Sequence, residues 1–355
     1  MKTRFAVSLM FVFLPSLALG QASPALQLTT HIALPGVDGR MDHLSVDLKG
    51  QRLFATAFDY HTLEVIDVQA GRRVSTIKDL DEPQAAYYDA ANNHLFVSSG
   101  GDGSVKMFDG STFRLLQTVK LSADADNVRY DARRQHVIIG YGGEKFLNGQ
   151  AARQQGDGAL AILDMSGKKI GEIPTDAHAE SFQLEQTGTR VFINVPDKQE
   201  IQVADLASLK TLAHWPLTGC SDNFPMALDE PHHRLFIACR GPAVLMVLDT
   251  ESGRPVTSIS LGPGLYSDDI FFDRAKSRIY FVARTATGSD PRAPGPGVIE
   301  IIQQKDADHY ERMGRVSSGF GAQTGFFVPD WGKLFVATRR QQGGPGGEIL
   351  VFETK

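Results

Sequence analysis

The chain has 355 residues, of which 42% are hydrophobic and 22% charged, and its formal net charge at pH 7 is −5. This composition is typical of a soluble globular protein with enough apolar material for a sizeable core. The excess of acidic residues argues against non-specific binding of nucleic acid, because such binding needs a basic surface.

Residues 1–20 have the pattern of a secretory signal peptide. The basic start MKTR precedes the apolar run FAVSLMFVFLPSLAL, and small residues offer a cleavage site after Gly20. A membrane anchor is the alternative, but the run is short for a span and contains Pro15. We therefore predict that the mature chain is periplasmic or secreted. No later segment is apolar enough to cross a bilayer, so we predict no membrane span.

The rest of the chain repeats one pattern, first seen in the stretch HLSVDLKGQRLFATAF that begins at His43. A hydrophobic run leads into a polar turn and then into a second run that opens with Leu, Ile or Val. This opening residue recurs at Leu53, Leu95, Val137, Val191, Leu235, Ile279 and Leu334. The successive intervals are 42, 42, 54, 44, 44 and 55 residues. The pattern therefore indicates seven structural repeats, three of which carry insertions.

Each repeat has the composition of a small antiparallel sheet. In the first repeat the runs HLSVD, RLFATA, LEVIDV and RVSTIKDL are rich in β-branched residues and are separated by polar turns. Four such strands in each repeat of about 42 residues are typical of a blade of a β-propeller. We name these strands a to d in chain order.

The seventh repeat lacks a strand d, whereas residues from Gln27 to Leu34 form a spare strand before the first repeat. Pairing this strand with the last blade would close the ring and remove an exposed edge. We therefore predict a single all-β domain over residues 21–355, a seven-bladed β-propeller of four-stranded blades whose last blade is completed by the N-terminal strand. A straight solenoid of seven hairpins is the alternative.

The insertions all fall between strands b and c, in the third, sixth and seventh repeats. They read GEKFLNGQAARQQGDG, TATGSDPRAPGPG and QQGGPGG. Because they are rich in Gly and Pro, we expect irregular loops. These loops should lie on the face where strand a begins, which we call the top face.

Cys220 and Cys239 are the only cysteines, and an oxidising compartment favours their pairing. Cys220 precedes strand a of the fifth blade, and Cys239 lies near the end of strand b. Antiparallel pairing of these strands brings both cysteines to the top face, so we predict a disulfide. The chain has no C-x-x-C-H haem motif and no cysteine or histidine set typical of a structural zinc site.

The repeats resemble the YVTN-repeat, YncE-like family of secreted bacterial β-propellers over nearly the whole mature chain. The segments HLSVDLKGQRLFAT, DADNVRYDARRQHVIIGYG, NFPMALDEPHHRLFIACR and VLDTESGRPVTSI carry this resemblance. It implies the propeller fold. It does not select a function, because related propellers include lactonases, lyases and non-enzymatic binding proteins.

Alignment of the repeats brings polar residues to the start of strand a, which lines the channel of a propeller. The first aligned position holds Asp42, Gln84, Asp126, Glu180, Phe224, Asp268 and Gln323. The next position holds His43, Ala85, Asn127, Ser181, Pro225, Asp269 and Thr324. His178 stands two residues before Glu180. Strand b ends in an arginine in the last three repeats, at Arg240, Arg284 and Arg339.

These columns predict a polar site at the top mouth of the channel. We predict that its ligand-binding residues are Asp42, His43, Asp126, Asn127, Glu180, Asp268, Asp269, Arg240, Arg284 and Arg339. A purely structural network of acids and arginines is one alternative. A divalent-cation site, formed by Asp42, Asp126, Glu180 and Asp268, is another.

The favoured function is that of a periplasmic or secreted binding or scaffold protein, a monomer that takes a small polar ligand or a protein partner on its top face. No cofactor and no catalytic residue is predicted, because motifs such as G-x-S-x-G and H-E-x-x-H are absent from the sequence. The alternative is a lactonase-like hydrolase or a lyase that depends on a divalent metal such as Ca²⁺ or Mg²⁺.

Overall fold

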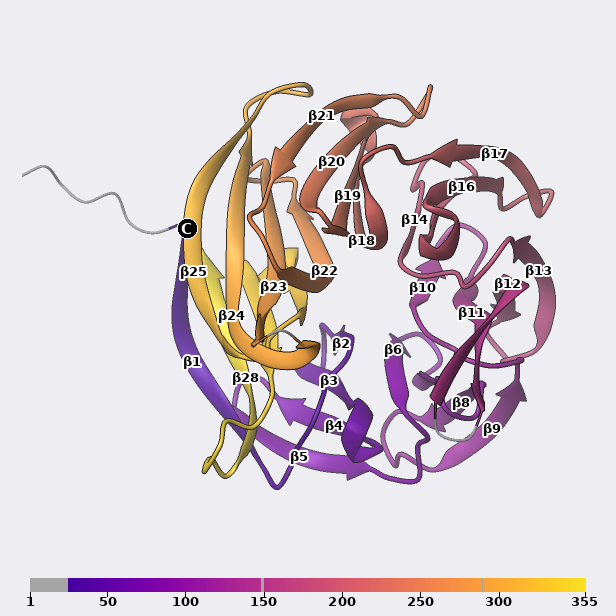
Figure 1. Cartoon of the computed structure of the whole chain (residues 1–355). Helices are drawn as coiled ribbons and strands as arrows, with labels where there is room; N and C mark the ends of the chain where they lie inside the picture. The colour runs from indigo at the N-terminus through magenta and orange to yellow at the C-terminus, as the bar shows by residue number, and fades with distance from the viewer. Residues whose placement is uncertain (1–24, 148–149, 289) are drawn as a thin grey trace, which may run out of the picture.

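Seven antiparallel four-stranded sheets are arranged as blades around a common axis (Figure 1). The computed structural model describes residues 25–147, 150–288 and 290–355. The predicted signal peptide, residues 1–20, lies outside the described residues. The prediction of a seven-bladed β-propeller is confirmed.

The first three blades follow the chain in order. Blade 1 is β2 (Leu44–Asp47), β3 (Arg52–Ala57), β4 (Thr62–Asp67) and β5 (Arg72–Ile77). Blade 2 is β6 (Pro83–Asp89), β7 (His94–Ser99), β8 (Ser104–Asp109) and β9 (Leu115–Lys120). Blade 3 is β10 (Val128–Asp131), β11 (His136–Leu147), β12 (Gln150–Asp164) and β13 (Lys169–Thr175).

The next three blades continue the same order. Blade 4 is β14 (Phe182–Leu184), β15 (Arg190–Val195), β16 (Glu200–Asp205) and β17 (Lys210–Pro216). Blade 5 is β18 (Ser221–Asp229), β19 (Arg234–Gly241), β20 (Ala243–Asp249) and β21 (Pro255–Ser260). Blade 6 is β22 (Leu265–Asp273), β23 (Arg278–Thr287), β24 (Asp290–Gln304) and β25 (Tyr310–Phe320). Single 3₁₀ turns form four connections, η1 (Phe58–Tyr60), η2 (Pro196–Lys198), η3 (Glu230–His232) and η4 (Pro329–Trp331).

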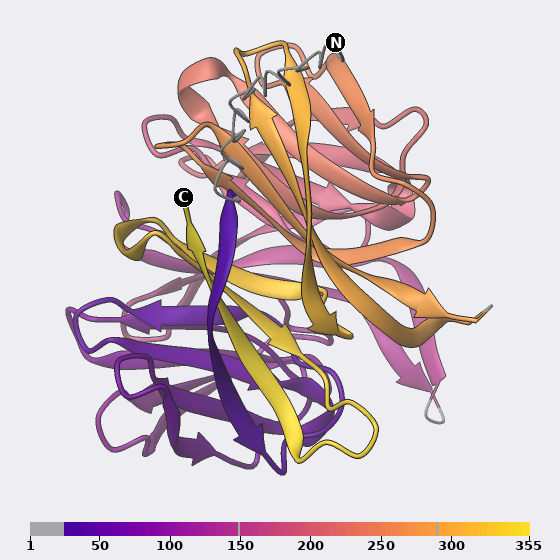
Figure 2. The same cartoon turned by 90° about the vertical axis from the view of Figure 1, so that its left-hand side faces the viewer.

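Blade 7 is assembled from both ends of the described chain. Its strands are β26 (Thr324–Val328), β27 (Lys333–Thr338), β28 (Gly346–Thr354) and β1 (Leu26–Pro35). β1 pairs antiparallel with β28, from Leu26 opposite Thr354 to Pro35 opposite Gly346. Figures 1 and 2 show β1 running beside β28. The predicted closure of the last blade by the N-terminal strand is therefore confirmed.

The repeated Leu-Phe pair of strand b is explained by its position between two neighbouring blades. In β3, Leu53 and Ala55 pack into a cluster shared with blade 7, whereas Phe54 packs into a cluster shared with blade 2. Successive side chains of a strand point to opposite faces, and both faces of an inner strand are covered here. Each of the seven interfaces between blades holds one such apolar cluster.

Two of the three insertions are not the irregular loops that we expected. In blade 3 the pairing of β11 with β12 continues to Leu147 and Gln150, and in blade 6 the pairing of β23 with β24 continues to Thr287 and Asp290. Both hairpin arms project to the same side of the ring (Figure 2). The prediction was wrong because the hydrogen bonds between two paired strands join backbone groups and need no particular side chain. Bulges in the two hairpins accommodate the glycines. In the third insertion, QQGGPGG, residues 341–345 are irregular as expected, and the last two glycines begin β28.

The aspartates that close strand c hold the turn to strand d. Asp109 Oδ1 accepts hydrogen bonds from the backbone N–H groups of Ser111 and Thr112. At the equivalent place in blade 4, hydrogen bonds from Ser208 lower the pKa of Asp205 to about 2. These aspartates therefore have a structural role.

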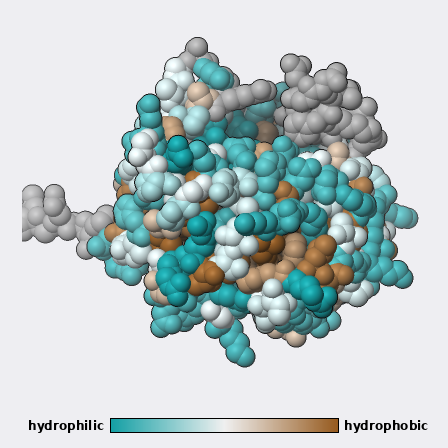
Figure 3. Space-filling view, turned by 90° about the horizontal axis from the view of Figure 1, so that it is seen from below, coloured by the Kyte–Doolittle hydropathy of each residue, from teal (hydrophilic) through white to brown (hydrophobic). Residues whose placement is uncertain are grey.

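None of the helices in the described part of the chain has the length and hydrophobicity that crossing a bilayer requires. The side of the ring that Figure 3 shows edge-on is mainly hydrophilic, and its hydrophobic side chains form small groups. Exposed large hydrophobic residues on the outer strands include Val74, Leu115, Ile170, Leu212 and Met313.

Cys220 and Cys239 form a disulfide across blade 5, with a Cα–Cα separation of 5.5 Å. Both side chains are buried in the cluster between blades 4 and 5. The bond therefore ties the start of strand a to the end of strand b at the top face.

Replacement of both cysteines by alanine should lower the free energy of unfolding by about 3 kcal/mol, the chain-entropy estimate for a loop of this length. The two cysteines are 19 residues apart. Urea unfolding of the oxidised protein and the variant measures this difference. Dithiothreitol should destabilise the wild-type protein to a similar extent and leave the variant unchanged. An unchanged urea midpoint in both comparisons would contradict the prediction.

Candidate functional site

A cavity of about 380 Å³ opens at the top mouth of the channel. The residue at the start of strand a in every blade lines it, namely Asp42, Gln84, Asp126, Glu180, Phe224, Asp268 and Gln323. This set is the column that the aligned repeats bring together. A cavity of this volume is large enough for a small metabolite.

The three arginines at the ends of strand b line the same cavity. Arg240 forms an ion pair with Asp268, and Arg284 donates a hydrogen bond from Nε to the side-chain oxygen of Gln323. Arg339 differs, because its Nε atom is buried and has no hydrogen-bond partner among the described residues. A buried donor without a partner costs free energy.

Asn127 and Asp269 do not line this cavity, although we predicted them at the mouth. They lie one step further along strand a, where they contact His43, which does line the cavity. The His43 Nδ1 atom is 3.1 Å from Asp269 Oδ1, and His43 Nε2 is 3.2 Å from Asn127 Nδ2. Asp269 Oδ2 also accepts a hydrogen bond from the backbone N–H of Gly325. The three side chains form a polar layer across the channel.

His43 carries the positive charge of this layer. Burial alone would lower the pKa of His43, but the carboxylates of Asp269, Asp42 and Asp126 outweigh it and raise the pKa to about 10. An imidazolium donates from both ring nitrogens. The charged ring therefore needs an acceptor beside Nε2, and the Asn127 amide provides one when it is flipped so that Oδ1 faces Nε2. The flip also gives Asn127 Oδ1 a hydrogen bond that it otherwise lacks.

Below the polar layer lies a second cavity of about 310 Å³ with apolar and aromatic walls. His43 lines both cavities, so the layer separates them. Tyr87 and Tyr130 stack on its wall with ring centroids 4.9 Å apart. The polar site is thus confined to the top end of the channel.

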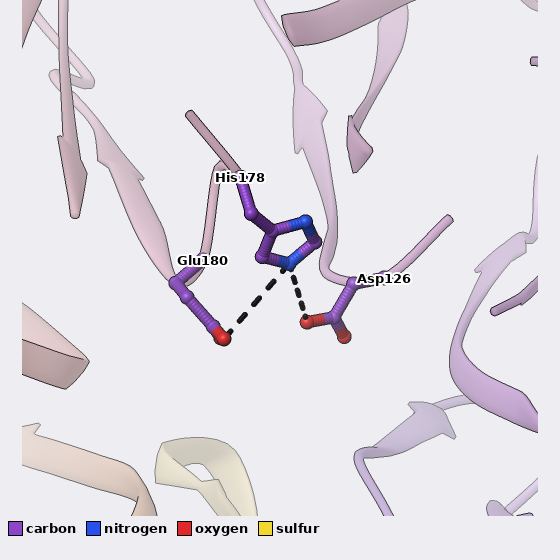
Figure 4. A group of neighbouring side chains, drawn as sticks. All are labelled: Asp126, His178 and Glu180. Atoms are coloured by element: carbon purple, nitrogen blue, oxygen red, sulfur yellow. Dashed lines mark ion pairs between the residues drawn. The ribbon is translucent and has the colours of Figure 1, made fainter. Parts of the chain in front are cut away.

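The acidic side of the mouth is built by blades 3 and 4 around His178 (Figure 4). The His178 Nε2 atom is 3.6 Å from Asp126 Oδ2 and 3.9 Å from Glu180 Oε1. Burial raises the pKa of Glu180 well above its usual range. Burial acts in the same direction on Asp126, but the neighbouring His178 and His43 outweigh it and hold the pKa of Asp126 below its usual value.

Arg40 lines the cavity although the sequence did not single it out. Its guanidinium lies 3.7 Å from the centre of the Phe58 ring, and its Nη2 atom is 2.7 Å from Asp42 Oδ2. Burial is the main cause that raises the pKa of Asp42 to about 6, and Arg40 opposes this increase. Arg40 stands two residues before the aligned column, as His178 does, so comparison of that position across the repeats would have found it. Phe58 and Asp59, which also line the cavity, gave no repeated signal of this kind.

The mouth therefore has two halves of opposite character. Carboxylates and His178 come from blades 3 and 4, whereas Arg240, Arg284 and Arg339 come from blades 5 to 7. Asp42 and Asp268 are each paired with an arginine. The arrangement can receive an anionic group on one side and a cationic group on the other.

Comparison of the chain with models of protein families, and with the sequences of curated proteins, gives no match.

Proposed function

We propose that the chain is a periplasmic or secreted β-propeller that binds a small polar ligand with an anionic group in the mouth cavity. We further propose that it belongs to the YVTN-repeat, YncE-like propellers, whose repeat residues it resembles. The observation that carries the binding function is the unpartnered, buried Nε of Arg339 beside two further guanidiniums in one cavity. A carboxylate or phosphate would supply the missing acceptor, and arginine binds such groups in a fork geometry.

Loss of the Arg339 guanidinium should weaken anion binding at least tenfold, since a hydrogen bond to a charged group contributes about 1.5–3 kcal/mol. Isothermal titration calorimetry with citrate, a set of hydroxy acids and inorganic phosphate would compare the wild-type protein with Arg339→Met. Arg340→Met is the matched control, because Arg340 is exposed and is paired with Asp38 at 3.3 Å. Equal losses in the two variants, or no binding of any anion in the panel, would refute the proposal.

A hydrolase or lyase is the second candidate function. It is favoured by the opposite pKa shifts of Asp126 and Glu180 beside one histidine, which provide a base and an acid at the same cavity. Hydrolysis of a simple lactone by the purified protein would separate this candidate from ligand binding alone.

A further inference from the structure

Asp126, His178 and Glu180 leave a gap between their polar atoms. The two carboxylate oxygens and the imidazole Nε2 all lie within 4.8 Å of one another. The separations from Nε2, 3.6 and 3.9 Å, are too long for hydrogen bonds. They are close to the distance of about 3.4 Å that separates two ligands of one tetrahedral zinc ion, given metal–ligand bonds of about 2.1 Å.

His178 is held in the orientation that a metal ligand requires. Its Nδ1 atom hydrogen-bonds to the backbone carbonyl of Gly142, so that Nε2 faces the two carboxylates. Metal-binding histidines commonly use one ring nitrogen to hydrogen-bond a backbone carbonyl and the other to bind the metal. Gly143 packs against the backbone of the same histidine, with φ of +82°, and a Cβ there would lie 2.6 Å from the His178 backbone nitrogen.

A second, independent observation comes from the other oxygen of Asp126. The residue is only 5% exposed, and its Oδ1 accepts no hydrogen bond from the described residues. A buried carboxylate oxygen without a donor costs free energy. His43 Nε2 is 3.8 Å from this oxygen, which is too far for a hydrogen bond. Because Asp126 lines the mouth cavity, a cation held by both of its carboxylate oxygens would supply the missing interaction.

A second cluster of two carboxylates and a histidine lies on the outside of the ring, and we call it the outer group. It shows that these residue types alone do not create a gap that could hold a cation. Asp176, Glu200 and His214 also bring their polar atoms within 4.8 Å of one another, but on the exposed side of blade 4. There, His214 Nδ1 is 2.8 Å from Glu200 Oε1, so the histidine and the carboxylate already satisfy each other. The outer group therefore leaves no gap for a cation between these two atoms.

We propose that Asp126, His178 and Glu180 bind a divalent cation of the zinc class, with a coordination position open to the mouth cavity. An imidazole ligand and only three protein donors suit zinc better than Ca²⁺ or Mg²⁺, which prefer more numerous oxygen ligands. The part of this inference that concerns the ligand rests on the proposed function: the anionic group held by the arginines would also reach the open position.

The test is Zn²⁺ titration of the untagged, chelator-treated protein by calorimetry, with Co²⁺ absorption as a readout of ligand geometry. The wild-type protein should bind one equivalent of Zn²⁺. Asp126→Asn and His178→Gln should each weaken binding at least a hundredfold and abolish the Co²⁺ bands, while circular dichroism shows an intact fold. The matched control, His214→Gln, removes the histidine of the outer group and should bind Zn²⁺ like the wild type.

Unchanged Zn²⁺ affinity in Asp126→Asn, or an equal loss in His214→Gln, would overturn the inference. Binding of Ca²⁺ or Mg²⁺ in preference to Zn²⁺ would overturn the assignment to the zinc class. Repeating the anion titrations with EDTA separates the two proposals. Anion binding without any Zn²⁺ binding leaves only the proposed function standing, whereas Zn²⁺ binding without anion binding leaves only the metal site.

Discussion

A mature chain that lacks residues 25–35 is expected to lose its cooperative native state. Three side chains of β1, those of Leu26, Ile32 and Leu34, are fully or almost fully buried. Burying a large apolar side chain contributes about 1.5–3 kcal/mol. Together with the lost ladder to β28, the deletion removes about as much free energy as stabilises a whole domain. Thermal unfolding followed by circular dichroism should show a broad transition, and limited proteolysis should cut blade 7 rapidly.

Two controls show whether the effect comes from β1 itself. Leu28 lies on the same strand but is 39% exposed, so Leu28→Ala should change the melting temperature far less than Ile32→Ala. A synthetic peptide of residues 25–35, added to the truncated chain, should restore part of the cooperativity, because it can pair with the free edge of β28. A truncated chain that melts sharply at the wild-type temperature would show that the ring does not depend on this strand.

Replacement of His43 by glutamine is expected to destabilise the protein by about 3–5 kcal/mol at pH 6, because it leaves Asp269 buried without its cationic partner. The pKa of His43 is about 10 in the folded chain, whereas an unperturbed histidine has a pKa of 6.5. A raised pKa means that the charged form stabilises the fold fully below about pH 6.5, and that this stability is lost as the pH rises towards 10. The wild-type protein should therefore weaken over this range more steeply than His43→Gln.

Urea unfolding at pH 6 and at pH 10, in the presence of EDTA, measures this dependence. The groups that face His43 are Asp42, Asp126, Asn127 and Asp269. The double variant His43→Gln/Asp269→Asn should recover part of the lost stability, because it removes the unpaired charge. Because the pKa of His178 is also raised, some alkaline slope should remain in the variants. An equally steep slope in His43→Gln and the wild type would contradict the assignment to His43.

The fold could be predicted because all seven blades pack in the same way and therefore need the same pattern of residues. Each strand b lies between two blades, so residues such as Leu53 and Phe54 are required at a fixed spacing in every repeat. The hairpin arms were missed because their ladders depend on the backbone. Their Gly-rich and Pro-rich sequences carry no alternation of apolar and polar side chains that would indicate strands.

The candidate site could be predicted only as far as the repeat alignment reaches. The seven residues at the first aligned position all line the cavity, because this backbone position lies at the channel mouth in each blade. One position further on, Asn127 and Asp269 lie in the polar layer instead, because the strand runs down the channel. The partner of each acid could not be predicted either. Arg240 pairs with Asp268 of the neighbouring blade, and Arg40 lies outside the two aligned columns although it is only two residues from Asp42.

The meeting of β1 with β28 also sets the order in which the ring can be completed. Leu26 pairs with Thr354, so the contact that closes blade 7 joins nearly the most distant residues of the described chain. Contacts of such long sequence separation form slowly, because the intervening chain must first be ordered. Blades 1 to 6 can assemble from local hairpins while the chain emerges, but the last blade must wait for its final strand. Until then an open edge is exposed, and this interval is when the protein is most prone to aggregate.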